Sequence, residues 1–281
     1  MGDHYVPRYY LKGFSQNDGK TIYVYDKTEQ RCFETQVKSI ANETDFYSPE
    51  VEGYLANTIE ASANDVLKKI RDRVEISAYD KQILSAYMTC MIKRVPKGKE
   101  KLKELAPGIA EEVRQKIDIL LDAAAREQPD KNEFIQERRA EIGEIIDRYA
   151  KDPPNQIWLI NMPPEKSPRV LAALSSMTWQ FLIFDGYPAF LSSDNPLFFF
   201  TSMGIGKPES EVTFPISSNI ALWATWRLDL KEGYFPTNSQ VVKELNRRTC
   251  SIATRYIFHC KSEDWVLPVL TMGRWQLSMI R

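Results

Sequence analysis

The chain has 281 residues, of which 43% are hydrophobic and 27% are charged, so it is long enough to bury a sizeable core in one large domain or two modest ones. Its formal net charge of -1 excludes strong electrostatic steering of the whole chain toward nucleic acid or acidic lipid. The longest apolar runs, such as residues 220–226, are too short to span a bilayer, and no signal peptide is visible. We therefore expect a cytoplasmic protein with no membrane partner.

The first fourteen residues are rich in aromatic and apolar side chains and hold His4, one of only two histidines. Disordered termini are normally polar, so we expect this segment to be docked, close to residues 192–196. Residues 21–25 and 31–35 are β-branched and aromatic enough to predict two strands of a hairpin with a five-residue connection. Residues 1–50 therefore form an N-terminal hairpin segment.

A helical period replaces the strand pattern from residue 51. Apolar residues recur at three- and four-residue steps up to residue 74, and Ser77 is suited to cap a second helix that Pro96 ends. Pro107 and the glycine after it interrupt the pattern, and two further apolar stripes follow at residues 109–124 and 134–149. Residues 51–150 are thus predicted to be a block of four or five helices that pack largely on one another.

The remaining residues, 151–281, alternate short apolar segments with turn signals, which predicts a sheet-rich half. Asp185 and Gly186 are expected to form a hairpin-type turn between two of its strands. We predict helices at 169–177 and 241–249 and strands at 157–161, 179–184, 188–191, 197–201, 212–216, 220–226 and 251–259. The whole chain, 1–281, is predicted to be a single α+β domain with an N-terminal hairpin, a central multi-helix block and a mostly antiparallel C-terminal sheet.

The four cysteines are widely spaced and form no C-x-x-C pair, which favours reduced, buried thiols. A zinc site from Cys250, His259 and Cys260 lacks standard ligand spacing and a clear fourth ligand, and two histidines in all exclude a histidine-rich metal cage. There is also no P-loop, G-x-G-x-x-G, H-E-x-x-H or G-x-S-x-G motif. P-loop phosphoryl transfer and α/β-hydrolase chemistry are therefore disfavoured.

Several short motifs, in a fixed order along most of the chain, resemble those of a widespread, largely bacterial family of unknown function. The opening H-x-x-P-x-x-Y-L-x-x-F motif and a late S-D-x-P motif are the specific ones, and Asp3 departs from the pair of adjacent histidines with which many relatives start. The resemblance implies a common site more than a reaction. The matching residues are His4, Pro7, Tyr10, Leu11, Phe14, Asp45, Phe46, Tyr47, Arg94, Pro96, Ser193, Asp194, Asn195, Pro196, Phe214, Pro215, Ile216, Ser217 and Asn246.

Three of these residues are candidates for chemistry, and each has a structural alternative. His4 can act as a general base or metal ligand, or it can bond the backbone and fix the N-terminus. Asp194 can hold a metal or orient His4, or it can form an ordinary turn before a proline. Arg94 can bind a phosphate or carboxylate, or serve as a cation at a helix C-terminus.

Other polar residues are candidates for binding. Glu60 can point into a site as a metal ligand or flank its helix in water. The basic run at residues 93–103 can contact nucleic-acid phosphates, although a solvated helix end is favoured because acidic residues follow closely. Ser193, Asn195 and Asn246 complete the candidate binding set.

These residues together suggest a pocket between the helical block and the sheet. His4 would be general base or ligand, Asp194 would orient it or share a divalent metal, and Arg94 would bind an anionic group. Hydrolysis of a phosphoester, with a nuclease as one form, is the most economical reaction for such groups. The alternative is a non-catalytic module that binds a small molecule, a nucleic acid or a protein.

Overall fold

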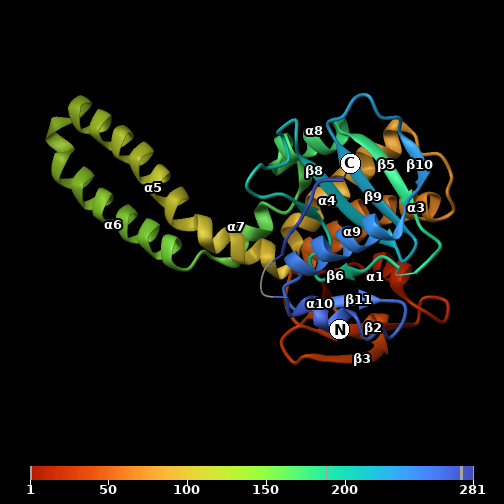
Figure 1. The fold of residues 1–281 in the computed structure, drawn as a ribbon. Helices are drawn as coiled ribbons and strands as arrows, with labels where there is room; N and C mark the ends of the chain where they lie inside the picture. The colour runs from red at the N-terminus through yellow and green to blue at the C-terminus, as the bar shows by residue number, and fades with distance from the viewer. Residues whose placement is uncertain (1, 188, 273–274, 281) are drawn as a thin grey trace. The chain divides into compact units, whose positions relative to one another are not determined.

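The computed structural model describes residues 2–187, 189–272 and 275–280 (Figure 1). The chain divides into two compact units. The larger unit runs up to Pro96 and resumes at Met162, and the smaller unit is Lys97–Asn161. Helices and strands are segregated along the chain, and the strands are largely antiparallel, so the predicted α+β class is confirmed.

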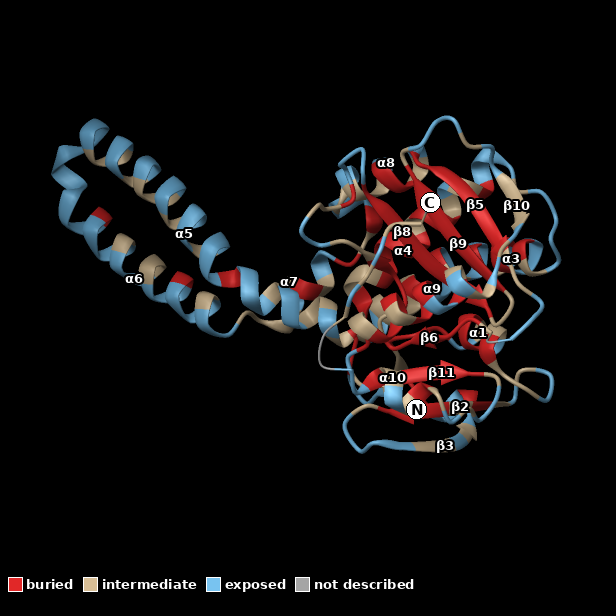
Figure 2. Cartoon of the chain, in the orientation of Figure 1, coloured by how far each residue is buried: buried red, intermediate tan, exposed pale blue. Residues whose placement is uncertain are grey.

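A five-stranded sheet forms the centre of the larger unit, and its inner strands are almost wholly buried (Figure 2). All neighbours in it are antiparallel except β10, which runs parallel to β5. The near-continuous apolar sequence of β9 fits a strand that is covered on both faces. In spatial order the strands are β10 (Gly233–Pro236), β5 (Thr178–Ile183), β9 (Ile220–Thr225), β8 (Glu211–Ser217) and β7 (Phe198–Phe199).

A second sheet joins the N-terminal hairpin to the C-terminal part of the chain. Its strands are β3 (Arg31–Gln36), β2 (Thr21–Asp26), β11 (Tyr256–His259) and β6 (Ser192–Ser193), in that order and all antiparallel. The hairpin that the sequence predicts is therefore confirmed. A separate short pair is formed by β1 (Asp3–His4) and β4 (Asn42–Glu43).

The helices of the larger unit start at clear local signals. Ser77 and Asp80 form a reciprocal capping box at the start of α4, and Asn238 caps α9 through two backbone N–H groups. The α-helices are α1 (Arg8–Leu11), α2 (Pro49–Tyr54), α3 (Ala61–Arg71), α4 (Ala78–Arg94), α8 (Pro168–Ser176), α9 (Ser239–Ile252) and α10 (Val266–Leu270). The described residues of the unit also form the 3₁₀ turns η1 (Lys12–Phe14), η2 (Val37–Ser39) and η5 (Pro164–Lys166) and the π-helix η3 (Leu55–Glu60).

The smaller unit is a helical hairpin. Two ion pairs, Arg114 to Asp147 at 2.5 Å and Arg139 to Asp118 at 2.7 Å, join its two long helices in an antiparallel register. Its elements are α5 (Pro96–Glu127), of which Pro96 still belongs to the larger unit, η4 (Pro129–Lys131), α6 (Asn132–Lys151) and α7 (Asn155–Ile160). Among the described helices of the whole chain, none has the length and apolar character needed to cross a membrane.

Several predicted elements need correction. Residues 157–161 were expected to be a strand but lie mostly in α7, because a short apolar run cannot be assigned to strand or helix by periodicity. Pro96 opens α5 as well as following α4, and Pro107 lies inside α5 without ending it. A proline such as Pro96 is tolerated in the first turn of a helix, because a backbone N–H at that position would have no partner within the helix.

The predicted pairing across Asp185 and Gly186 is also wrong. β5 pairs with β9 and β10 instead, residues 189–191 form no strand, and Pro188 lies outside the described residues. The predicted strands at 197–201 and 251–259 are shorter, because β7 covers two residues and α9 continues to Ile252.

Candidate functional site

The opening segment is anchored where the sequence predicts it, against the late S-D-x-P region. The hydroxyl of Tyr10 lies 2.8 Å from that of Ser192 and donates to the carbonyl oxygen of Pro215 at 2.7 Å. From the other side, Arg71 of α3 donates to the carbonyl oxygens of Tyr9 and Tyr10. The segment is thus fixed by buried polar contacts as well as by its apolar side chains.

Arg94 brings three of the predicted site residues together. Its guanidinium, only 1% exposed, donates from Nη1 to Glu60 Oε1 at 2.7 Å and from Nη2 to the carbonyl oxygen of His4 at 2.7 Å. The buried cation therefore has one charged partner and one backbone partner. Arg94 holds the backbone of His4 in place through its carbonyl oxygen. The imidazole of His4 is therefore not needed for this contact.

A hollow of about 510 Å³ opens beside this arginine. Residues from the opening segment form one part of its wall, and residues from α2, η3 and α3 form the other. His4 and Glu60 both line it, as does Asp3, whose Oδ2 accepts from the backbone N–H of Tyr47. The full lining is Gly2, Asp3, His4, Arg8, Tyr9, Lys12, Glu52, Glu60 and Asn64.

Polar atoms without partners gather at this hollow. His4 Nε2, Glu52 Oε2 and Asn64 Oδ1 are buried and have no hydrogen-bond partner within the described part of the chain. The Nε atom of Arg94, just behind them, has none either. Buried polar atoms normally find partners, so each of these groups needs an explanation, and a ligand is one. The imidazole of His4, the carboxyl of Glu52 and the amide of Asn64 all belong to residues that line the hollow.

Burial shifts the ionisation of two of these groups in opposite directions. It lowers the pKa of His4 below its usual 6.5, helped by Arg8 and Arg94 and opposed by a hydrogen bond with the Lys38 backbone and by Asp3. It raises the pKa of Glu52 above its usual 4.5, and Arg94 only partly offsets this. The two shifts favour the neutral form of the imidazole and the protonated form of the carboxyl, the forms that a base and an acid need.

Sequence reasoning missed Glu52 and Asn64. Asn64 lies four residues after Glu60, the spacing of one helical turn, so this pair could have been found by its period. Glu52 could not, because the π-helix η3 lies between it and Glu60 and changes the phase of the helix. Single-turn π segments inside helices occur frequently at functional sites.

Asp194 lies elsewhere and has a different set of contacts. Its carboxylate is 1% exposed and accepts three backbone N–H groups, from Thr254 at 2.8 Å, Arg255 at 2.6 Å and Tyr256 at 2.9 Å. Burial raises its pKa to about 6, against the lowering effect of those hydrogen bonds. These contacts fix the backbone at the start of β11.

The expected pairing of Asp194 with His4 is not found. Asp194 does not line the hollow, and the charges that act on His4 come from Arg8, Arg94 and Asp3. The carboxylate instead acts on Tyr5, the next residue along, whose pKa is raised first by burial and then by Asp194. His4 is thus influenced by the carboxylate of Asp3, and Tyr5 by that of Asp194.

The three predicted binding residues near Asp194 also make backbone contacts. Ser193 Oγ accepts from the N–H of Asn195, and Asn195 Nδ2 donates to the carbonyl oxygen of Ile252. Asn246 of α9 bonds residues 189 and 191 through its two amide atoms. Asn195 and Asn246 join the late loop to α9, while the Ser193 bond lies within the loop. None of the three lines the hollow, and their binding role stays a prediction.

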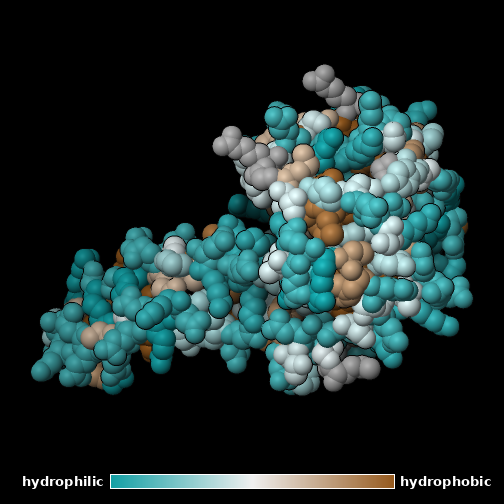
Figure 3. Space-filling view, turned by 60° about the horizontal axis from the view of Figure 1, so that its bottom comes forward, coloured by the Kyte–Doolittle hydropathy of each residue, from teal (hydrophilic) through white to brown (hydrophobic). Residues whose placement is uncertain are grey.

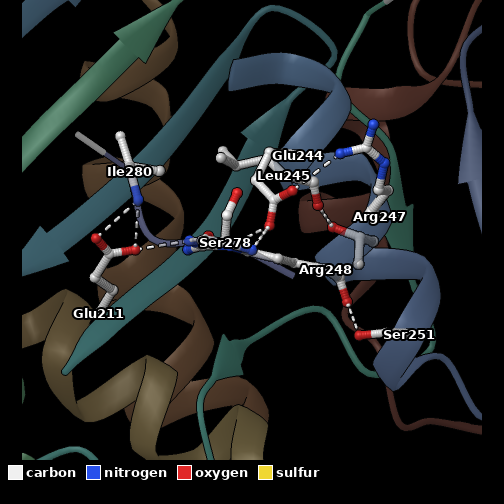
Figure 4. Close-up of polar contacts among 9 residues, drawn as sticks. Glu211, Glu244, Leu245, Arg247, Arg248, Ser251, Ser278 and Ile280 are labelled. Carbon is white, nitrogen blue, oxygen red and sulfur yellow. Dashed lines mark hydrogen bonds and ion pairs between the residues drawn. The ribbon is translucent and has the colours of Figure 1, made fainter. Parts of the chain in front are cut away.

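A second buried polar cluster lies between α9 and β8 (Figure 4). Arg248, with 0% exposure, donates to Glu211 Oε2 at 2.7 Å and reaches Glu244 Oε1 at 3.4 Å. The same two carboxylates accept the backbone N–H groups of Ser278 and Ile280. The cluster therefore fastens the C-terminal residues to the sheet.

No group of three or more histidine, cysteine, aspartate or glutamate side chains is placed to hold a metal ion in the described residues. The four cysteines are all free thiols. Burial raises the pKa of both Cys90 and Cys250 to about 12, as expected for structural thiols in apolar surroundings. The zinc alternative therefore finds no support in the side-chain geometry.

Comparison with known families matches residues 3–263 to the model of a protein family of unknown function, DUF4238. The chain belongs to this family. No curated protein and no solved structure matches it. The DUF4238 match starts at Asp3 and ends at Glu263, so it contains every residue of the hollow except Gly2 but not the C-terminal residues held by Arg248. Family membership thus confirms the resemblance that the sequence motifs indicate.

Proposed function

We propose that the hollow beside Arg94 binds an anionic phosphoester and hydrolyses it, with His4 as general base and Glu52 as general acid. A phosphodiester of nucleic acid is one substrate of this class. The observation that carries the proposal is that His4, Glu52 and Asn64, each of which has a buried polar atom without a hydrogen-bond partner among the described residues, all line one hollow. Each unmet group costs about 1–3 kcal/mol, and a polar ligand would relieve that cost.

Two cations of the wall can contact an anion, and the carboxyl groups of Asp3, Glu52 and Glu60 line the same hollow. Arg8 and Lys12 both line the hollow from exposed positions, where they can reach phosphate oxygens. In the proposed step, His4 Nε2 takes a proton from water, and the water oxygen attacks phosphorus. The ester P–O bond breaks as the Glu52 carboxyl gives its proton to the departing oxygen. Asn64 Oδ1 would accept a hydrogen bond from the water or from the substrate.

The first test is His4→Gln. We expect kcat/KM toward bis(p-nitrophenyl) phosphate or a single-stranded oligonucleotide to fall about 100-fold, because the base is lost. The free energy of unfolding should change by no more than about 1 kcal/mol, since Arg94 binds the carbonyl oxygen of His4 and not its ring. Asp65→Asn, on the exposed side of α3, is the matched control and should keep full activity. A wild-type protein that hydrolyses no phosphoester contradicts the proposal.

The second test is the pH profile of kcat/KM. His4 must be neutral and Glu52 protonated, so activity should rise with pH through a pKa below 6.5 and fall again through a pKa above 4.5. The optimum is therefore mildly acidic. Glu52→Gln should remove the alkaline limb while it keeps the acidic one, because the amide does not titrate. An alkaline limb that survives this substitution would rule out Glu52 as the acid.

One observation favours the non-catalytic alternative. Arg94 uses both of its terminal nitrogens on Glu60 and on the backbone of His4, so it has little left for an anion. In that case the hollow would bind a ligand without reaction. Binding of the oligonucleotide or of inorganic phosphate that is lost on Arg8→Ala, in a protein with no phosphoesterase activity, would select this alternative.

A further inference from the structure

The helical hairpin of the smaller unit has an apolar groove. The groove measures about 320 Å³ and is lined entirely by apolar and aromatic residues of α5, α6 and the segment that leads into α7. Among them are Ala106, Ile109 and Val113 on α5 and Ile142, Ile145 and Ile146 on α6. Their spacing follows the helical period, so each helix presents one apolar stripe to the same groove.

Two helices alone cannot cover these stripes. Ala106, Ile135 and Ile146 are buried, but Ile109, Val113, Ile145 and Tyr149 keep 48%, 40%, 43% and 41% of their surface exposed. Leu105, Leu120 and Phe134 are also exposed, at 50%, 68% and 54%. Both long helices are largely exposed along their length in Figure 2, and apolar atoms show between the hydrophilic side chains of the hairpin in Figure 3. Apolar surface of this extent on a hairpin usually marks an interface.

Charge is distributed unevenly along the hairpin. Residues 97–103, at the start of α5, hold four lysines and one glutamate, a balance of +3. Residues 118–133, around the turn, hold five acidic and two basic residues, a balance of -3. Along α5 the charge therefore changes from positive near the start of the helix to negative near its end, while residues 144–152, on the α6 side of the base, hold three acidic and two basic residues. Two copies whose α5 helices pack in opposite directions would place the positive start of each α5 against the negative end of the other.

We propose that residues 97–161 pair with the same hairpin of a second copy, antiparallel, to form a four-helix bundle. Two hairpins related by a twofold axis present the same apolar face to each other. The apolar side chains that protrude from one hairpin then fill the groove of the other, and the single interface covers both faces. The size is adequate. The face of a 20-residue helix pair is about 30 Å long and roughly 20 Å wide, on the order of 600 Å² per partner or about 1,200 Å² in total, which is the lower limit for a specific, stable interface.

The test is the molar mass of the full chain by sedimentation equilibrium. We expect twice the chain mass of 32.5 kDa for the wild type and a monomer for Ile109→Glu/Ile145→Glu. Leu228→Glu, at an 83% exposed leucine of the larger unit, is the matched control and should stay dimeric. A wild type that is monomeric at all concentrations up to about 100 µM overturns the proposal and leaves the groove to a foreign helix, since weaker pairing would be below the usual affinity of a specific interface.

Charge reversal separates loss of pairing from loss of fold. Lys101→Glu/Lys103→Glu adds acidic residues near the start of α5, and Glu127→Lys/Asp130→Lys adds basic ones at its end. Both changes complement the helix dipole, so neither should melt the hairpin. Each pair alone should weaken dimerisation about tenfold, and the four together should restore it. Equal dissociation constants in all four proteins would contradict the antiparallel arrangement.

Discussion

Replacement of Arg248 by methionine is expected to lower the free energy of unfolding by about 3–5 kcal/mol. The guanidinium has no exposure to water and lies between Glu211 and Glu244. It also lies over the rings of Phe198 and Phe200, at 5.2 and 5.1 Å from their centroids. Methionine fills similar space and keeps the apolar contact, but it leaves the buried Glu211 without its cation and Glu244 with only the half-exposed Arg247.

Arg247→Met supplies the control. Arg247 is the next residue of α9 and pairs with the same Glu244 at 3.1 Å, but its side chain is 43% exposed. An exposed ion pair contributes less than about 1 kcal/mol, so this variant should unfold close to the wild type. Urea denaturation followed by circular dichroism measures both. Equal stability of the two variants would mean that the buried cluster contributes no more than a surface pair.

The same cluster explains how the end of the chain is held. Glu244 accepts the N–H of Ser278 at 2.8 Å, and Glu211 accepts that of Ile280 at 3.0 Å (Figure 4). Arg248 binds both carboxylates and so fixes their orientation. Loss of Arg248 should therefore release residues 275–280 from the sheet before the rest of the unit unfolds, which hydrogen exchange can detect.

Local sequence signals were sufficient for most elements of this fold but not for their pairing. The β2–β3 hairpin follows from two β-branched segments and a turn, and all its pairs are between near neighbours. Its contact with β11 joins Tyr25 to Ile257, which lie more than two hundred residues apart. No period or cap encodes such a pairing, because it depends on which strand edge is left open once the core has packed.

In the candidate site, too, the sequence predicts some of the residues but not all of their contacts. His4, Glu60 and Arg94 were identifiable from motif and helix position, and they meet through the contacts of one guanidinium. Glu52 was not, because the π-helix shifts its face relative to an ordinary helix. Asp194 was ambiguous between chemistry and a turn, and sequence cannot count the N–H groups that surround a carboxylate.

Asp194→Ala is expected to lower the free energy of unfolding by roughly 3–5 kcal/mol, because three buried N–H donors lose their acceptor at once. Those donors belong to Thr254, Arg255 and Tyr256, and they position the strand that joins the hairpin to β6. Asn195→Ala, at the adjacent residue, removes one hydrogen bond to Ile252 and should cost only about 1 kcal/mol.

The pair of variants also decides what Asp194 does. A structural Asp194 predicts that residual activity of the folded Asp194→Ala protein, measured well below its melting temperature, stays near the wild-type value while stability falls. A catalytic Asp194 predicts the reverse, a large loss of activity with little loss of stability. The three N–H groups around the carboxylate and its absence from the hollow favour the first outcome, because three of its roughly four acceptor sites are already used by the backbone.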